Sequence, residues 1–318
     1  MSSTLVGISP TLVEVPPVVH DLAGRLRPGA TVVPVWRNEY GGLTARLEDG
    51  AQLVDGAQLE DGADAPGRTT SRAAGRSSYL KWVPHGSACP DPFAEADRLV
   101  WASSHAPLPR VLDVGRDRHG SWLLTEAVER DGAIATSAIE PRWRALAKRS
   151  AIAVGLGLRR LHDLLPVDTC SFVRTAELRV AALTRSAART RNAAVTLRGT
   201  SLGDPPPVDR LVVCHGDATV PNTLLDRAGR FVAHVDVGDL GVADRWSDIA
   251  VTTRSVTRRY GPGLEPLVLA AYGVAPDPVR TRYYRALWDA EEAVRVRRVA
   301  RRPEPRRPDR GGHLRRVS

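Results

Sequence analysis

The residues with the clearest chemical potential lie between Val213 and Asp226, in the sequence VCHGDATVPNTLLD. His215, Asp217 and Asn222 follow an apolar run there in the order H-x-D-x-x-x-x-N. Catalytic loops that transfer phosphoryl groups have this spacing. A carboxylate orients the attacking hydroxyl and takes its proton, and an amide oxygen nearby holds magnesium on the triphosphate. We therefore expect Asp217 to be the catalytic base and Asn222 a metal ligand.

A second carboxylate stands at Asp236, fourteen residues after Asn222 and within the apolar run Phe231 to Val237. A carboxylate at a strand end, followed by glycine, can reach metal ions that bridge phosphate groups. Taken singly, these residues have structural explanations, as a buried histidine, a turn former or a helix cap. Their order and spacing, with strand patterns on both sides, favour Mg²⁺-dependent transfer from a nucleoside triphosphate.

The elements that must position these residues fall into two halves, and the first half is rich in strands. β-Branched and aromatic residues flank a Gly41-Gly42 pair, which predicts a hairpin over residues 31–47. Further strands are predicted at 79–83, 110–114 and 121–126, and a helix at 92–105.

The second half is mainly helical. Apolar residues at three- and four-residue spacings predict helices at 142–164, 244–256 and 276–294, and short buried strands at 211–214 and 231–237. The expected fold class is α+β, with an N-terminal lobe over 1–126 and a C-terminal lobe over 127–294.

Two segments fall outside these lobes. Residues 48–77, in which Asp-Gly-Ala recurs, read as a low-complexity loop insertion. Residues 295–318 hold ten arginines against Glu304 and Asp309, so this segment carries +8 of the net charge of +9. We expect it to be a disordered tail. The body is nearly neutral, which makes a nucleic-acid partner unlikely for it.

The composition also indicates where in the cell the protein is expected to lie. No apolar stretch approaches the roughly 18 to 20 residues that cross a bilayer, and the first twenty residues lack a basic start and an uninterrupted apolar core. Three cysteines, Cys89, Cys170 and Cys214, lie far apart and form no C-x-x-C pair. We expect a cytoplasmic protein with no membrane partner, whose oligomeric state the sequence leaves open.

The motif and its surroundings resemble the aminoglycoside phosphotransferases, particularly the kanamycin and neomycin kinases that modify a 3'-hydroxyl. The resemblance rests on HGDATVPN followed by VDVGDLGVADRWSDIA, and on NEYGGLTARL, YLKW, FAEADRLVW, SWLLTEAV and AYGVAPDPVRTRYYRALWD in the same order. It covers most of residues 30 to 292 and implies a two-lobed, protein-kinase-like fold. It also implies transfer of the γ-phosphate of ATP or GTP to an aminoglycoside hydroxyl, giving antibiotic resistance.

The resemblance assigns nucleotide-binding roles in the first lobe. Lys81 would contact the α- and β-phosphates, with Glu95 on the following helix as its partner. Tyr79 would stack on the base. By the same resemblance, Gly41 and Gly42 belong to the loop over the triphosphate, and Thr125 and Ala127 to the inter-lobe hinge whose main chain reads the base.

The acceptor end departs from the family. Kinases of polycationic aminoglycosides line the acceptor cleft with carboxylates. Here Arg258-Arg259 stands where well-known kanamycin kinases carry an acidic pair, and Asp239 replaces an arginine found in many members. Carboxylates remain on the terminal helix, where the resemblance predicts acceptor binding by Asp289, Glu291 and Glu292.

These departures keep two alternatives open. One is a kinase of the same fold that acts on another small hydroxylated metabolite. The other is a non-catalytic remnant whose arginine-rich tail binds nucleic acid. The joint presence of Lys81, Glu95, Asp217, Asn222 and Asp236 favours an enzyme.

Overall fold

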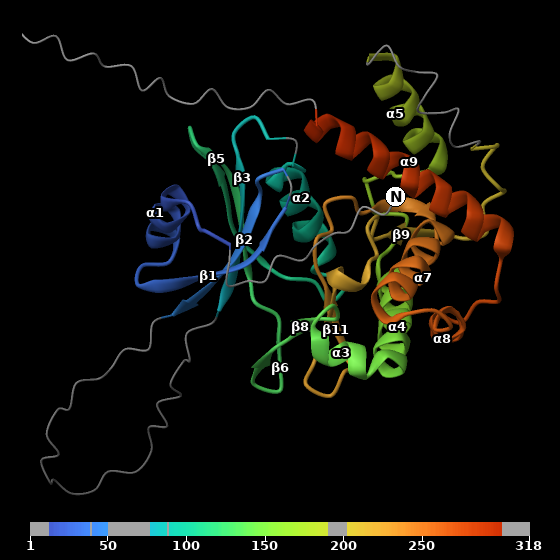
Figure 1. Cartoon of the computed structure of the whole chain (residues 1–318), viewed down its shortest axis with the longest axis horizontal. Helices are drawn as coiled ribbons and strands as arrows, with labels where there is room; N and C mark the ends of the chain where they lie inside the picture. Colours follow the sequence, from blue (N-terminus) through green and yellow to red (C-terminus); the bar gives the residue numbers. More distant parts are fainter. Residues whose placement is uncertain (1–12, 39, 50–76, 88, 190–201, 301–318) are drawn as a thin grey trace, which may run out of the picture.

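The computed structural model describes residues 13–38, 40–49, 77–87, 89–189 and 202–300. Its first lobe is built on one antiparallel sheet in the order β1-β2-β3-β5-β4 (Figure 1). The strands are β1 (Ala30–Arg37), β2 (Leu43–Asp49), β3 (Ser78–Pro84), β4 (Val111–Arg116) and β5 (Gly120–Glu126). All five strands expected from the sequence are present.

Two helices pack on opposite faces of this sheet (Figure 1). Helix α2 (Pro92–Ala102) was expected, and it starts at Asp91, whose carboxylate accepts a hydrogen bond from the Phe93 amide at 3.1 Å. Helix α1 (Pro17–Leu26) was not expected. Its buried Val19 and Leu22 join the sheet residues Leu43, Leu47 and Leu80 in one apolar cluster.

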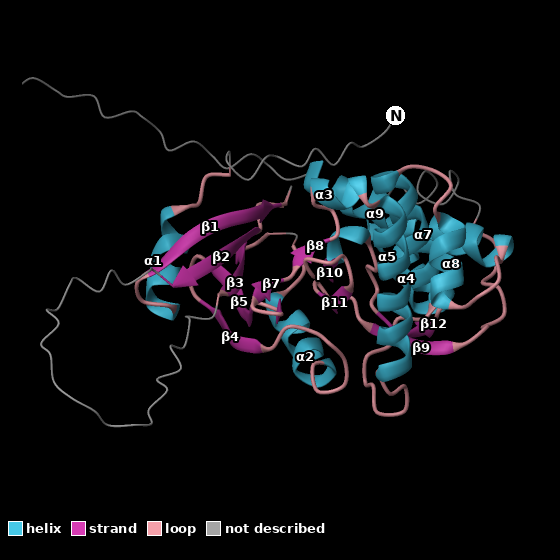
Figure 2. Cartoon of the chain, turned by 90° about the horizontal axis from the view of Figure 1, so that it is seen from below, coloured by secondary structure: helices cyan, strands magenta, loops and turns pink. Residues whose placement is uncertain are grey.

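The second lobe is mainly helical (Figure 2). Its central helix α4 contacts α7, α8 and the short strands β9 and β11. The helices are α3 (Pro141–Ala145), α4 (Ala147–Leu164), α5 (Ala176–Arg189), α7 (Trp246–Tyr260), α8 (Glu265–Tyr272) and α9 (Pro278–Ala300). Together the lobes confirm the predicted α+β class, with an antiparallel sheet followed by a helical lobe.

Short strand pairs frame the loops that carry the motif. β9 (Leu211–Cys214) pairs antiparallel with β12 (Gly241–Asp244), and β10 (Thr223–Leu225) lies between β11 (Phe231–His234) and β8 (Thr136–Ser137). The 3₁₀ turn η2 (Val220–Asn222) precedes β10, and a small ribbon joins β6 (Glu129–Arg130) to β7 (Ala133–Ile134). The motif residues thus leave the ends of β9 and β11.

Several boundaries differ from the sequence-based expectation. The helix expected over 142–164 is divided at Leu146, whose φ of −108° and ψ of 32° interrupt the helix. The strand expected over 231–237 ends at His234. Helix α9 continues to Ala300, past the Val294 at which the tail was expected to begin, because arginine favours helices and Pro303 is the first proline to follow.

Parts of the expected insertion and tail, residues 50–76 and 301–318, lie outside the described residues. Within the residues that are described, no helix is long and apolar enough to cross a membrane.

Candidate active site

The catalytic loop runs from the end of β9 to η2, and it brings Asp217 and Asn222 together. The Asn222 amide Nδ2 donates to the Asp217 main-chain carbonyl at 2.9 Å and to its carboxylate at 3.1 Å. Asn222 is buried, whereas Asp217 is partly exposed. The amide therefore fixes the direction of a carboxylate that solvent and an acceptor can reach.

His215 joins this loop to the segment that carries Asp236. Its Nε2 donates to the carbonyl of Val235 at 2.9 Å, and its Nδ1 accepts from the Asp217 amide at 3.3 Å. Gly216 brings the two segments into close contact. Its φ is +87°, and a Cβ atom there would lie 2.1 Å from the Asp239 carbonyl oxygen. Only glycine fits at this position.

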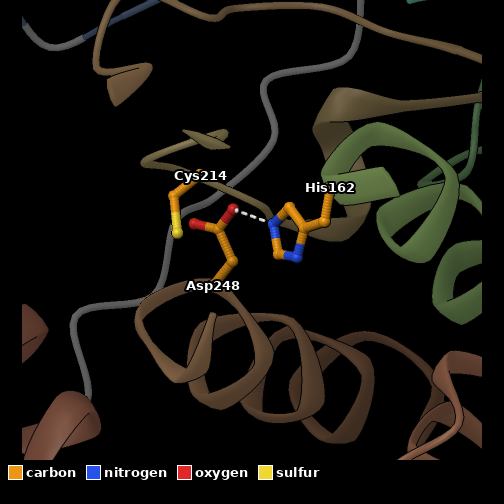
Figure 3. A group of neighbouring side chains, drawn as sticks. All are labelled: His162, Cys214 and Asp248. Atoms are coloured by element: carbon orange, nitrogen blue, oxygen red, sulfur yellow. Dashed lines mark hydrogen bonds and ion pairs between the residues drawn. The ribbon is translucent and has the colours of Figure 1, made fainter. Parts of the chain in front are cut away.

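The buried carboxylate of Asp248 on α7 accepts hydrogen bonds from the main chain of the catalytic loop. Asp248 accepts hydrogen bonds from the His215 amide at 2.5 Å and from the Gly216 amide at 3.0 Å. It also accepts from His162 of α4 at 3.0 Å, and Figure 3 shows the imidazole directed at the carboxylate. The other ring nitrogen of His162 meets the Tyr272 hydroxyl at 2.7 Å. The helices α7, α4 and α8 are thereby connected to the loop.

His162, Cys214 and Asp248 lie close enough to be considered as a metal centre (Figure 3). Their chemistry argues against it. Burial, together with the nearby charge of Asp248, raises the pKa of the Cys214 thiol well above its ordinary value, so the thiolate that a metal needs is disfavoured. Burial alone would raise the pKa of Asp248, but its hydrogen bonds to His162 and His215 hold it at about 2. The carboxylate is ionised and already hydrogen-bonded.

Lys81 of β3 connects the two lobes. Its ammonium Nζ lies 2.6 Å from a Glu95 carboxylate oxygen on α2 and 2.5 Å from an Asp236 oxygen in the second lobe. Burial by itself would lower the pKa of Lys81, but the two carboxylates outweigh it and raise the pKa above the ordinary value. Lys81 lowers the pKa of Asp236 in return, against the opposing effect of burial. Both groups are charged at neutral pH.

The donor set around Asp236 suits magnesium. The Asp236 side chain is 50% exposed, and carboxylate and amide oxygens are the protein ligands that this ion prefers. Asn222 turns its nitrogen toward Asp217, so its amide oxygen points the other way. Asp236 has a φ of +61°, a region that few residues other than glycine adopt. Such local strain is typical of functional positions.

The glycine turn between β1 and β2 is closed by a residue to which the sequence reading gave no role. The side-chain carbonyl of Asn38 accepts from the amides of Tyr40 at 3.0 Å and Gly42 at 2.8 Å, and Gly41 has a φ of +87°. In this conformation the Gly42 amide, expected near a phosphate oxygen, is used within the turn. Asparagine is a common turn-forming residue, and its presence just before the glycine pair could have indicated this role for Asn38.

The residues expected around the base lie on neighbouring strands. Tyr79 of β3 is directly opposite Thr125 of β5 in the sheet register. The Ala127 amide, which the resemblance directs toward the base, donates to the Ser77 carbonyl at 3.0 Å. Tyr79 and the expected hinge therefore lie close together. In this conformation the Ala127 amide is occupied by its hydrogen bond to Ser77.

The three acceptor-side carboxylates lie on α9, and Asp289 and Glu291 form ion pairs with arginines. Asp289 is 2.5 Å from Arg254 of α7, and Glu291 is 2.7 Å from Arg179 of α5. A third arginine, Arg174, reaches Glu291 at 3.5 Å. The pairing of Glu291 with Arg179 was not expected from the sequence, because α5 was not predicted.

Taken together, the paired Asp217 and Asn222, the exposed Asp236 and the Lys81–Glu95 pair form one cluster of the residue types that phosphoryl transfer from a nucleotide requires. Comparison with known proteins identifies the family of the chain. Residues 55–284 match the phosphotransferase enzyme family, and the chain belongs to that family. The resemblance read from the motifs is thereby confirmed.

Individual relatives carry more specific names. The chain is 35% identical over 224 residues to an aminoglycoside 3'-phosphotransferase of Streptomyces fradiae, covering 64% of this chain and 81% of that protein. It is 32% identical over 249 residues to a streptomycin 3''-kinase of Streptomyces griseus, covering 69% and 86%. Among solved structures, an aminoglycoside-3'-phosphotransferase of type VIII superposes with a TM-score of 0.66 at 28% identity, over 86% of this chain and 98% of that one.

Proposed function

We propose that this protein transfers the γ-phosphate of a nucleoside triphosphate to a hydroxyl group of an aminoglycoside, and so confers resistance. The 3'-hydroxyl of kanamycin- or neomycin-type antibiotics is the favoured acceptor. The observation that carries the proposal is the convergence of Lys81, Glu95 and Asp236 beside the Asp217–Asn222 pair. The printed names of the relatives supply the acceptor class.

In this proposal Asp217 accepts the proton of the acceptor hydroxyl as its oxygen attacks the γ-phosphorus. The bond from that phosphorus to the bridging β–γ oxygen breaks, and the nucleoside diphosphate leaves. Lys81, held by Glu95, positions the α- and β-phosphates, while Tyr79, Thr125 and Ala127 surround the base. Gly41 and Gly42 cover the phosphates once their amides are released from Asn38.

Asn222 and Asp236 would hold Mg²⁺, which supplies neutralisation of charge on the phosphate oxygens when it is bound. Asp236 would hold the ion with a carboxylate whose Oδ1 lies 2.5 Å from the Lys81 ammonium group in this structure. We place the enzyme in the cytoplasm, where nucleoside triphosphates are available. The cysteines Cys89, Cys170 and Cys214 are free, which is compatible with a reducing compartment.

A panel of aminoglycosides, assayed with ATP and GTP in a coupled assay for the nucleoside diphosphate, tests this function. We expect turnover of 3'-hydroxylated members and phosphate at that position in the product, read by NMR spectroscopy. Loss of turnover with a 3'-deoxy analogue is the matched control. If none of the aminoglycosides were phosphorylated but another alcohol were, aminoglycosides would be ruled out as the acceptor class.

A kinase of a less cationic hydroxylated metabolite is the second candidate, and one observation favours it. Asp289 and Glu291, the carboxylates that were expected to meet ammonium groups, are paired with arginines of the same chain. The same panel separates the two candidates when neutral polyols are included in it.

A further inference from the structure

Asp289 and Glu291 lie on different sides of α9. They are two positions apart, which corresponds to about 200° around a helix axis. Asp289 accordingly meets Arg254 of α7 at 2.5 Å, while Glu291 meets Arg179 of α5 at 2.9 and 2.7 Å. A single acceptor group therefore cannot use both carboxylates in this arrangement.

Glu291 is neutralised by two guanidinium groups. Its side chain is 16% exposed, and that of Arg179 is 5% exposed, so their two parallel hydrogen bonds are largely removed from water. Such bidentate contacts are the strong form of the ion pair. Arg179 also donates to Ser247 at 2.6 Å, which fixes the guanidinium from a third side.

The second guanidinium group near Glu291 belongs to Arg174, which also contacts the catalytic loop next to Asp217. It lies 3.5 Å from Glu291, 3.4 Å from Asp239 and 3.4 Å from the carbonyl oxygen of Gly216, the residue before Asp217. Its backbone is held by a hydrogen bond from its amide to Val242 of β12 at 2.9 Å. The cluster Arg179, Glu291, Arg174 and Asp239 thus connects α5 and α9 to the catalytic loop.

The side of α9 that faces α7 is also cationic. Arg254 and Arg258 both lie over the Trp288 ring, at 5.6 and 5.7 Å from its centre, and Arg254 also pairs with Asp289. Burial and the charge of Arg254 lower the pKa of Arg258, as expected where two cations stand close together. An incoming ammonium group would meet repulsion here too.

We propose that Arg174 and Arg179 are specificity-determining residues that withhold Glu291 from the acceptor, so that an ammonium group at that position gives an acceptor no advantage over a hydroxyl group. This inference rests on the proposed function. The physical reason is that an ammonium group can bind Glu291 only by displacing a largely buried guanidinium, which would then be left without its partner. A hydroxyl group at the same place has no such requirement.

The test compares acceptors that differ by one amino group. Neomycin and paromomycin form one such pair, and kanamycin B and kanamycin A form another, with hydroxyl in place of amino in the second member of each. The measured quantity is the ratio of kcat/KM for the amino form to that for the hydroxyl form. Because the ratio is taken within one protein, incomplete folding or a disturbed catalytic loop cancels from it.

For the wild type we expect a ratio within about threefold of one for both pairs, because a screened ammonium group gains little. Arg174→Met and Arg179→Met release Glu291 and should raise the ratio about tenfold in at least one pair. Arg230→Met is the matched control, since it removes the same charge from an exposed turn, and should leave the ratio unchanged.

Glu291→Gln keeps the inference testable if the arginine variants do not fold, because it retains the shape of the side chain. We expect the wild-type ratio for this variant. A ratio that falls about tenfold in Glu291→Gln, or that stays constant when Arg174 or Arg179 is replaced, would overturn the inference. Turnover of none of the four acceptors would instead remove the proposed function and the inference that rests on it.

Discussion

The residues in the loop after β9 to which we assign the chemistry have partners that explain their types. Asp217 is directed by Asn222, and His215 and Gly216 tie the loop to the segment of Asp236. The H-x-D-x-x-x-x-N spacing and the later Asp-x-Gly are local patterns, so the sequence alone could indicate them. Arg174 could not be found this way, because its contacts come from segments that are distant in the chain.

Asp236 and Asp239 provide a test at the scale of single residues. Asp236→Ala removes the proposed metal ligand and leaves phosphate repulsion uncompensated, so magnesium-dependent nucleotide affinity and turnover should both fall by at least tenfold. Asp239→Ala should change nucleotide affinity little, because the Asp239 carboxylate is 41% exposed and contacts Arg174 at 3.4 Å.

Calorimetric titration of both variants with nucleotide, with and without magnesium, measures this difference. A similar loss of affinity in the two variants would mean that the metal ligand has been misplaced.

At the scale of elements, the strands were easier to predict than the helices. β-Branched and apolar residues indicated β1 to β5, and in β2 and β3 buried positions alternate with partly exposed ones. Helix α5 carries three arginines, and its pattern was hidden because Arg179 is buried through its pairing with Glu291 rather than exposed. Helix α1 was missed because three prolines, Pro10, Pro16 and Pro17, precede and open it.

Asp248 tests how α7 supports the catalytic loop. Asp248→Asn keeps the size of the side chain but removes the charge that accepts from His162, His215 and Gly216. We expect it to reduce the free energy of unfolding at pH 7 by about 2 to 4 kcal/mol, and kcat by at least tenfold.

The pH dependence of this loss has a defined sign. The pKa of Asp248 is about 2 in the folded protein, below the ordinary value of about 3.9. Its stabilisation is therefore complete above about pH 4 and is lost as the pH falls toward 2. Thermal melts of wild type and variant should differ by a constant free energy from pH 7 to about pH 5. A difference that disappears already near pH 6 would contradict the assignment.

At the scale of the whole molecule, Lys81 joins an antiparallel sheet lobe to a helical lobe by its contacts with Glu95 and Asp236. The Arg98 side chain of α2 adds a second connection, donating to the Leu240 carbonyl at 2.9 Å. The order of the motifs along the chain sufficed to predict two lobes. The closeness of the lobes could not be predicted, since it depends on side chains more than a hundred residues apart.

The arginine-rich end should be dispensable for this body. Residues 301–318 contain few apolar side chains at core spacing, so their removal should change neither the melting temperature nor kcat appreciably. We expect a chain ending at Ala300 to match the full-length protein in both measurements. A marked drop in either one would show that these residues stabilise the folded lobes.

The central claim is that Asp217 acts on the acceptor hydroxyl in a nucleotide-dependent phosphoryl transfer, and Asp217→Asn tests it most directly. With kanamycin as acceptor, the account predicts that kcat falls by about 10² to 10⁴-fold, because the base is lost. Nucleotide affinity and melting temperature should stay near their wild-type values, since the partly exposed carboxylate does not contact the base. Turnover close to wild type in this variant would contradict the account.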